Sequence, residues 1–134
     1  MSNFVTIKAE EINAKENVEQ LVIDNIKQMD VFEELLKGTT YLSEYKTLLK
    51  YIEHLANGNT LPKTKFRHLE GVKDGIPEHE FKSKHLRLYA IQLPSKKIII
   101  FLGTKGNQDS DITGFRNLKE KYLQSLKMNR NEKK

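Results

Sequence analysis

The feature that most constrains the fold is a short, uninterrupted apolar run near the end of the chain, Ile98-Ile99-Ile100-Phe101-Leu102. β-Branched and aromatic side chains favour extended structure, and a run this short is typical of a strand. Neighbouring side chains of a strand point to opposite faces, so an apolar residue at every position predicts a central strand covered on both faces. We therefore expect a sheet built around this run, with Gly103 ending the strand.

Two segments before the run alternate between polar and apolar residues, which indicates two further strands. They are Glu80–Lys84 and Leu86–Ile91, and Pro94-Ser95 makes a turn before the central strand. Consecutive strands joined by short turns pair in an antiparallel way. In the second strand, the small apolar side chains of Leu86, Leu88 and Ala90 share one face and are expected to pack inward. Arg87 and Tyr89 then lie on the opposite face.

Apolar residues recur at helical spacing in three other segments, which we predict to be helices over 17–37, 41–57 and 111–127. Gly38 and Gly58 follow the first two as stop signals, and Thr40 and Ser110 are expected N-caps. A short edge strand is expected at Phe4-Val5-Thr6-Ile7.

The predicted fold class is α+β, with an N-terminal helical hairpin packed on a small antiparallel sheet and a C-terminal helix. The helices cover one face of the sheet, and the opposite face is left open for solvent or ligand. With 134 residues, we expect one domain spanning 1–134. Its parts are a mostly helical segment 1–60, a strand meander and helix over 61–127, and a frayed tail over 128–134.

The composition limits the classes of site. The chain has no cysteine and 4 histidines, none of which forms a close ligand pair, so we expect no disulfide, no metal and no cofactor. No apolar run approaches the roughly 20 residues of a membrane helix, and no secretory signal is visible. We expect a cytoplasmic protein that does not bind membranes.

Charge is divided unevenly along the chain. Residues 1–60 hold 6 Lys or Arg and 10 Asp or Glu, a net charge of −4, whereas residues 61–134 hold 17 and 8, a net charge of +9. Positive charge concentrated around the predicted sheet suggests a surface for a polyanion, RNA or DNA. The alternative is a solvated basic face without a ligand.

The open face predicted by the alternation carries groups that suit RNA. Arginine and lysine neutralise phosphate, and an aromatic ring stacks on an unpaired base. The same groups could cleave RNA if a base removes the proton of a 2′-OH and cations stabilise the phosphorus-centred charge. Each residue also has a structural explanation. Arg87 would be a salt-bridged strand residue, Lys82 and Lys84 would prevent aggregation through an edge strand, and Tyr89 would belong to the core.

Four segments resemble RelE/HigB-type toxins of bacterial toxin–antitoxin modules (the RelE/ParE superfamily), over about half of the chain. They are Lys65–Gly71, Glu80–Ile91 with its Arg87-Leu88-Tyr89 core, Lys97–Lys105, and the helical region 107–122. The resemblance implies a microbial-RNase-like fold, metal-independent cleavage of messenger RNA on the ribosome, and inhibition by a cognate antitoxin protein.

The resemblance also implies roles for particular residues. By position, Arg87 stabilises the transition state, Lys65 acts in proton transfer and Lys105 is the basic residue after the last core strand. The expected RNA-binding residues are Lys63, Arg67, Glu80, Lys82, Lys84, His85, Tyr89 and Gln108. The turn after the last strand departs from the pattern because Lys105 is followed by Gly106-Asn107-Gln108-Asp109, and the general acid has no match. A non-catalytic RNA- or ribosome-binding module and a gyrase-inhibiting toxin therefore remain alternatives.

Overall fold

The computed structural model describes residues 2–132 of the chain, with side chains as far as Met128. The elements follow in the order β1 (Phe4–Lys8), β2 (Asn17–Ile23), β3 (Ile26–Lys27), α1 (Gln28–Leu36), α2 (Tyr41–Ala56), β4 (Phe66–His68), β5 (Glu78–Lys82), β6 (Leu86–Gln92), β7 (Lys96–Thr104) and α3 (Gln108–Glu132). A single 3₁₀ turn, Lys105–Asn107, joins β7 to α3.

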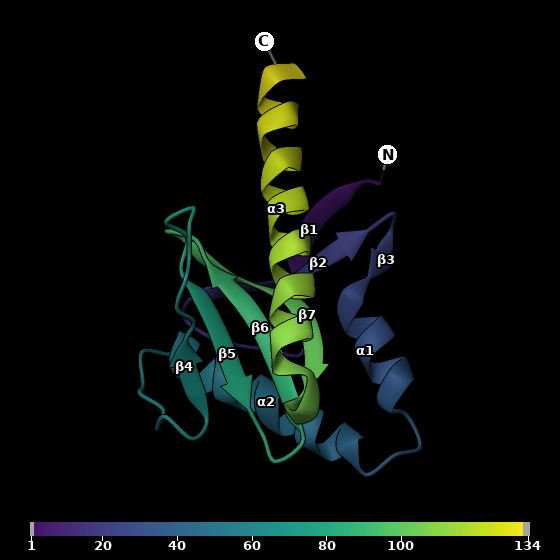
Figure 1. The fold of residues 1–134 in the computed structure, drawn as a ribbon, viewed down its shortest axis with the longest axis vertical. Helices are drawn as coiled ribbons and strands as arrows, with labels where there is room; N and C mark the ends of the chain where they lie inside the picture. The colour runs from purple at the N-terminus through teal and green to yellow at the C-terminus, as the bar shows by residue number, and fades with distance from the viewer. Residues whose placement is uncertain (1, 133–134) are drawn as a thin grey trace.

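One mixed sheet organises the molecule (Figure 1). Its strand order is β1-β2-β7-β6-β5-β4, and β3 adds to β2 beside this path. β5, β6 and β7 form the antiparallel meander expected from their short connections, and β4, which the sequence did not predict, pairs antiparallel to β5. β2 pairs parallel to β7, with Asn17 opposite Lys96 and Gln20 opposite Ile99, so the N-terminal part of the chain extends the sheet.

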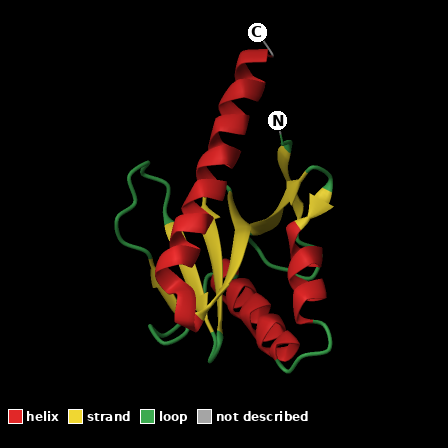
Figure 2. Cartoon of the chain, turned by 45° about the vertical axis from the view of Figure 1, so that its right-hand side comes forward, coloured by secondary structure: helices red, strands yellow, loops and turns green. Residues whose placement is uncertain are grey.

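The helices lie on both faces of the sheet (Figure 2). α1 and α2 pack on one face over a core that contains Phe32, Tyr45, Ile52 and Leu88. α3 packs on the other face over a second core that contains Leu21, Tyr89, Ile98 and Phe115. The structure is α+β with a C-terminal helix, as expected, but the predicted arrangement is wrong. The sheet has seven strands and is mixed, and no N-terminal helical hairpin packs on a small antiparallel sheet with an open opposite face.

The error begins at residues 17–23, which form β2 and not the first half of a helix. Val18 and Val22 are four residues apart, so they share a face in a strand as well as in a helix. The distinguishing signal is Asp24-Asn25, whose φ angles of 51° and 69° are both positive. These two residues connect Ile23 to its partner Ile26, as in the type I′ turns that join antiparallel strands.

The prediction for the apolar run is confirmed. Ile99 points into the core beneath α1 and α2, while Ile98 and Ile100 point into the core beneath α3. The register between β6 and β7 shifts at Tyr89/Ala90, which brings Phe101 as well onto the α3 side. The strand runs on through Gly103 to Thr104.

The ends of the helices differ from the predicted caps. The Thr40 hydroxyl makes no capping hydrogen bond, and the N–H of Tyr41 donates instead to the Thr39 hydroxyl at 3.2 Å. α3 begins at Gln108, so Ser110 lies inside it. The helix also continues through 128–132, where a frayed tail was expected, while 133–134 lie outside the described residues.

The face prediction for β6 is confirmed, but the face is not open. Leu86, Leu88 and Ala90 pack against the α1 and α2 side. Tyr89 lies on the opposite side and stacks on Phe115 of α3, with ring centroids 5.3 Å apart and an interplanar angle of 23°. An amphipathic third helix must bury its apolar stripe, and the apolar residues of that face supply the surface.

Candidate functional site

Strand pairing brings most of the predicted site residues to one end of the sheet, at the foot of Figure 1. The backbone N–H of Lys82 donates to the carbonyl of Lys65 at 2.8 Å, and that of Lys105 donates to the carbonyl of His85 at 2.9 Å. Arg87 pairs with Gly103. We call this region the basic end of the sheet and define it by Lys63, Lys65, Lys82, Lys84, His85, Arg87 and Lys105.

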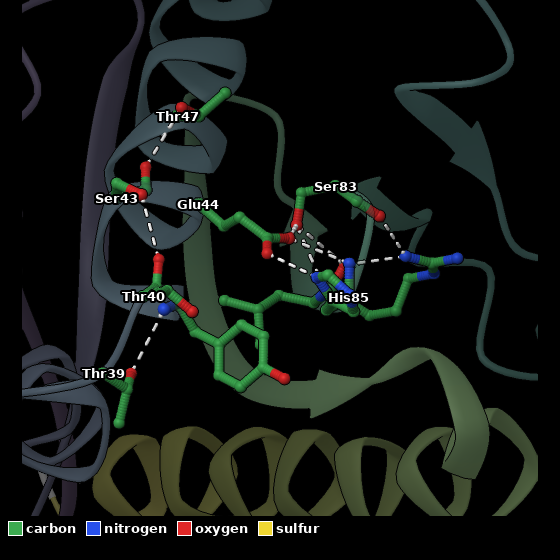
Figure 3. Close-up of polar contacts among 10 residues, drawn as sticks. Thr39, Thr40, Ser43, Glu44, Thr47, Ser83 and His85 are labelled. Carbon is green, nitrogen blue, oxygen red and sulfur yellow. Dashed lines mark hydrogen bonds and ion pairs between the residues drawn. The ribbon is translucent and has the colours of Figure 1, made fainter.

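A carboxylate from α2 organises the turn between β5 and β6 (Figure 3). Glu44 lies in the first turn of α2 and receives three hydrogen bonds. They come from the Ser83 hydroxyl at 2.6 Å, from the backbone N–H of His85 at 2.8 Å and from His85 Nδ1 at 2.7 Å. The His85 ring also lies beside Tyr41, with centroids 5.1 Å apart. The imidazole is therefore held from two sides while its side chain remains 47% exposed.

These hydrogen bonds favour the ionised form of Glu44. Partial burial favours the neutral form of Glu44, but the hydrogen bonds from Ser83 and His85 outweigh it and lower the pKa of the carboxyl to about 2. An ionised carboxylate only accepts hydrogen bonds, so His85 Nδ1 carries a hydrogen. Within residues 2–128, Nε2 of His85 has no hydrogen-bond partner, and in the neutral ring it presents its lone pair to solvent.

Ser83 is not arranged as a nucleophile. Its hydroxyl donates to Glu44 and receives a hydrogen bond from the N–H of Leu86 at 3.2 Å. Nucleophilic serines are activated by a hydrogen bond to an imidazole, whereas here the serine and the imidazole both bind the carboxylate. The arrangement can support proton transfer at His85 and not attack by Ser83.

A second polar cluster lies under the start of α3. Glu80 is fully buried and accepts hydrogen bonds from Arg67 Nε at 2.6 Å, from the Tyr89 hydroxyl at 2.9 Å and from Gln108 at 3.2 Å. Burial opposes ionisation of Glu80, but these donors outweigh it and hold its pKa below the usual range. Four of the predicted RNA-binding residues thus meet at the buried Glu80 carboxylate, while the Arg67 side chain remains 44% exposed.

Arg87 lies on the expected face of β6, but it is buried, with only 7% of its surface exposed. Its Nη1 donates to the carbonyls of Ser83 at 2.7 Å and of Leu86 at 2.8 Å. Its Nε is buried and has no partner among the described residues. The guanidinium therefore stabilises the turn that contains His85 by binding its backbone carbonyls.

The lysines of the basic end point in different directions. Lys65 lies 5.2 Å from the centroid of the Tyr51 ring of α2, which places it on the α2 side, away from Arg87 and Tyr89. Lys63, Lys84 and Lys105 are exposed and Lys82 is half-buried. None of these five lysines pairs with an acidic residue in the described part of the chain. The three predicted catalytic residues are therefore at one end of the sheet without sharing one pocket.

Folding pairs some negative charges of the N-terminal half with positive charges of the C-terminal half. Lys96 pairs with Glu19 at 3.0 Å, and His85 pairs with Glu44, so residues of the acidic half bind residues of the basic half. Sequence reasoning did not find Glu44. It precedes His85 by 41 residues, and its place in an amphipathic helix gives no sign of a partner on the sheet.

The comparisons with models of protein families, with curated proteins and with solved structures gave no match. Among the side chains described, which end at Met128, no three histidines or carboxylates come close enough together to hold a metal ion. None of the helices described combines the length and apolar character needed to cross a membrane.

Proposed function

We propose that this chain binds RNA at the basic end of the sheet and cleaves it by attack of a 2′-OH on the adjacent phosphorus. The observation that supports this most is the His85–Glu44 pair at 2.7 Å, which leaves Nε2 free on an exposed turn among unpaired lysines. An imidazole oriented by a carboxylate is a general base that works near neutral pH.

The proposed roles follow from the positions of the groups. His85 Nε2 takes the proton of the 2′-OH, and O2′ attacks phosphorus as the bond to the 5′-oxygen breaks. The ammonium of Lys105 protonates the leaving 5′-oxygen, since its backbone is fixed to His85 by a 2.9 Å hydrogen bond. The products are a 2′,3′-cyclic phosphate and a 5′-hydroxyl. Lys82 and Lys84 neutralise phosphate, and Glu44 and Arg87 are positioning residues.

The cellular role in this proposal is the one implied by the family resemblance. The chain acts in the cytoplasm as the toxin of a toxin–antitoxin module, cleaves messenger RNA on the ribosome and is held inactive by an antitoxin protein. These partners are parts of the proposal that rest on sequence motifs alone.

The experiment is controlled expression in a bacterial host, with growth recorded and transcript 5′ ends mapped, beside cleavage of a short RNA in vitro. We expect His85→Ala to lower cleavage by about 100-fold or more. His54→Ala is the matched control because His54 is an exposed histidine of α2. Cleavage at the wild-type rate in His85→Ala would remove His85 from the mechanism.

A non-catalytic RNA-binding module is the second candidate. It is favoured by Arg87, whose guanidinium binds backbone carbonyls where a catalytic arginine needs free donors. This candidate replaces cleavage if the wild-type chain binds RNA or ribosomes but produces no new 5′ ends in the host and no cyclic phosphate in vitro. Lys84→Gln with Lys105→Gln should then weaken binding.

A further inference from the structure

A cavity of about 530 Å³ lies between the middle of α3 and the loop that precedes β5. Its lining carries four cations, Lys73, Arg116, Lys119 and Lys127, and three carboxylates, Asp74, Glu78 and Glu120, beside Gly71 and Leu123. Arg116 is the first lining residue on α3 and is 8 residues beyond Gln108, so the cavity begins about 12 Å along the helix from the start of α3. It is separate from the groups of the proposed cleavage site.

The floor of the cavity is a neutral cluster of charges. Glu78 is 3% exposed and Lys119 is 2% exposed. Glu78 accepts hydrogen bonds from Arg116 Nε and from Lys119, both at 2.9 Å. Lys119 also donates to Asp74 at 2.8 Å and to the carbonyl of Ile76 at 2.7 Å. Two cations and two carboxylates therefore bind one another, and both oxygens of Glu78 are occupied.

Hydrogen-bond donors remain free above this floor. Arg116 uses Nε and Nη2, which donates to the carbonyl of Glu70, while Nη1 makes no hydrogen bond to the described residues. A Cβ at position 71 would lie 3.7 Å from both terminal nitrogens, so glycine leaves that edge of the guanidinium uncovered. Lys73 and Lys127 are exposed on opposite walls, and neither pairs with an acidic residue within 2–128.

We propose that this cavity binds a phosphate monoester. A guanidinium edge and two ammonium groups match a phosphate that carries nearly two negative charges at neutral pH. The volume lies in the range of small-molecule sites and exceeds what an inorganic ion fills, so an organic group occupies the rest, against Leu123. Such a phosphate is offered both by a free nucleotide and by the 5′ end of an RNA strand.

The test is titration of the full chain with AMP at low salt, followed by calorimetry and by NMR shifts of backbone amides at 71–78 and 116–127. We expect saturable binding that falls about tenfold or more in the double variant Lys73→Gln/Lys127→Gln. Both residues are exposed, so the variant keeps the buried ion pairs. Lys121→Gln is the matched control, because Lys121 is an exposed lysine of α3 outside the cavity lining.

A second arm distinguishes the two sources of phosphate. A short RNA with a 5′-phosphate is compared with the same RNA ending in a 5′-hydroxyl. Tighter binding of the phosphorylated strand that depends on Lys73 and Lys127 identifies an RNA end, and equal binding of both strands with AMP still bound identifies a free nucleotide. Absence of saturable AMP binding, or equal affinity in the double variant and the wild type, overturns the proposal. The outcome is independent of His85 because the readout is binding and not cleavage.

Discussion

Replacing Glu44 by glutamine tests the contact that holds the turn between β5 and β6. The wild-type carboxylate accepts three hydrogen bonds, from Ser83 and twice from His85. Glutamine has nearly the same shape, but it carries no charge and its amide nitrogen cannot accept. The variant therefore removes the electrostatic part of the contact and leaves the packing of α2 unchanged.

The expected loss follows from the pKa of the carboxyl. A group whose pKa falls from 4.5 to about 2 on folding stabilises the fold by about 3 kcal/mol above pH 5. The side chain is 21% exposed, and water screens its interactions, so we expect about 2 kcal/mol in practice. Because the folded pKa is lowered, this stability is present above pH 4.5 and is lost as the pH falls towards 2.

The assay is urea unfolding of the wild type and of Glu44→Gln at pH 7 and at pH 2.5. The difference in the free energy of unfolding is expected to shrink at the lower pH, because pH 2.5 is well below the unfolded pKa of 4.5 and close to the folded pKa of about 2. Asp30→Asn is the control, because Asp30 is an exposed acid in the first turn of α1 and reports the helix dipole alone. An equal difference at both pH values, or a loss no larger than in Asp30→Asn, would refute the reasoning.

Three further predictions concern other parts of the fold. Gly103→Ala places a Cβ 2.4 Å from Asp111 Oδ2 and 3.0 Å from Asp111 Cβ. We expect chemical denaturation to show a loss of about 1–3 kcal/mol in the free energy of unfolding. Gly106→Ala is the control and should be close to neutral, because its Cβ meets nothing within 4 Å. Burial first, and then the charge of Lys97, lowers the pKa of His79 to about 3, so the folded state excludes a proton that the unfolded chain binds. Stability therefore falls as the pH drops from about 6.5 towards 3. His79→Gln should reduce this loss in thermal unfolding, and His54→Gln, at an exposed histidine of α2, should not. Asn25→Gly, at a φ of 69°, should be neutral or stabilising by up to about 1 kcal/mol, and Asn25→Val should raise the population of unfolded chain measured by hydrogen exchange.

The meander and the second helix could be predicted because their signals are local. The apolar run at 98–102 specifies a strand buried on both faces whatever covers it, and the alternation at 86–91 specifies which side chains share a face. The stripe of Tyr45, Leu48 and Ile52 fits a helix and no strand, and α2 follows it closely. Each of these signals depends on the geometry of one element alone.

The candidate site was predictable only in part. The sequence predicted that basic residues would share an open face of the sheet, whereas antiparallel pairing gathers most of them at one end of it. The carboxylate that orients His85 belongs to another layer, and the direction of each side chain depends on what packs above it. Glu80 and Tyr89 were expected to meet RNA, yet α3 covers them and they bind each other at 2.9 Å.

The sequence by itself determined the local structures: a central apolar strand, two alternating strands, an amphipathic helix and a basic C-terminal half. Only the tertiary structure decided that residues 17–23 join the sheet beside β7, that α3 closes the second face, and that Glu44 binds His85. The physical reason is that periodicity states which side chains share a face but not which surface will bury them. That choice depends on the total apolar area removed from water, to which every element of the chain contributes.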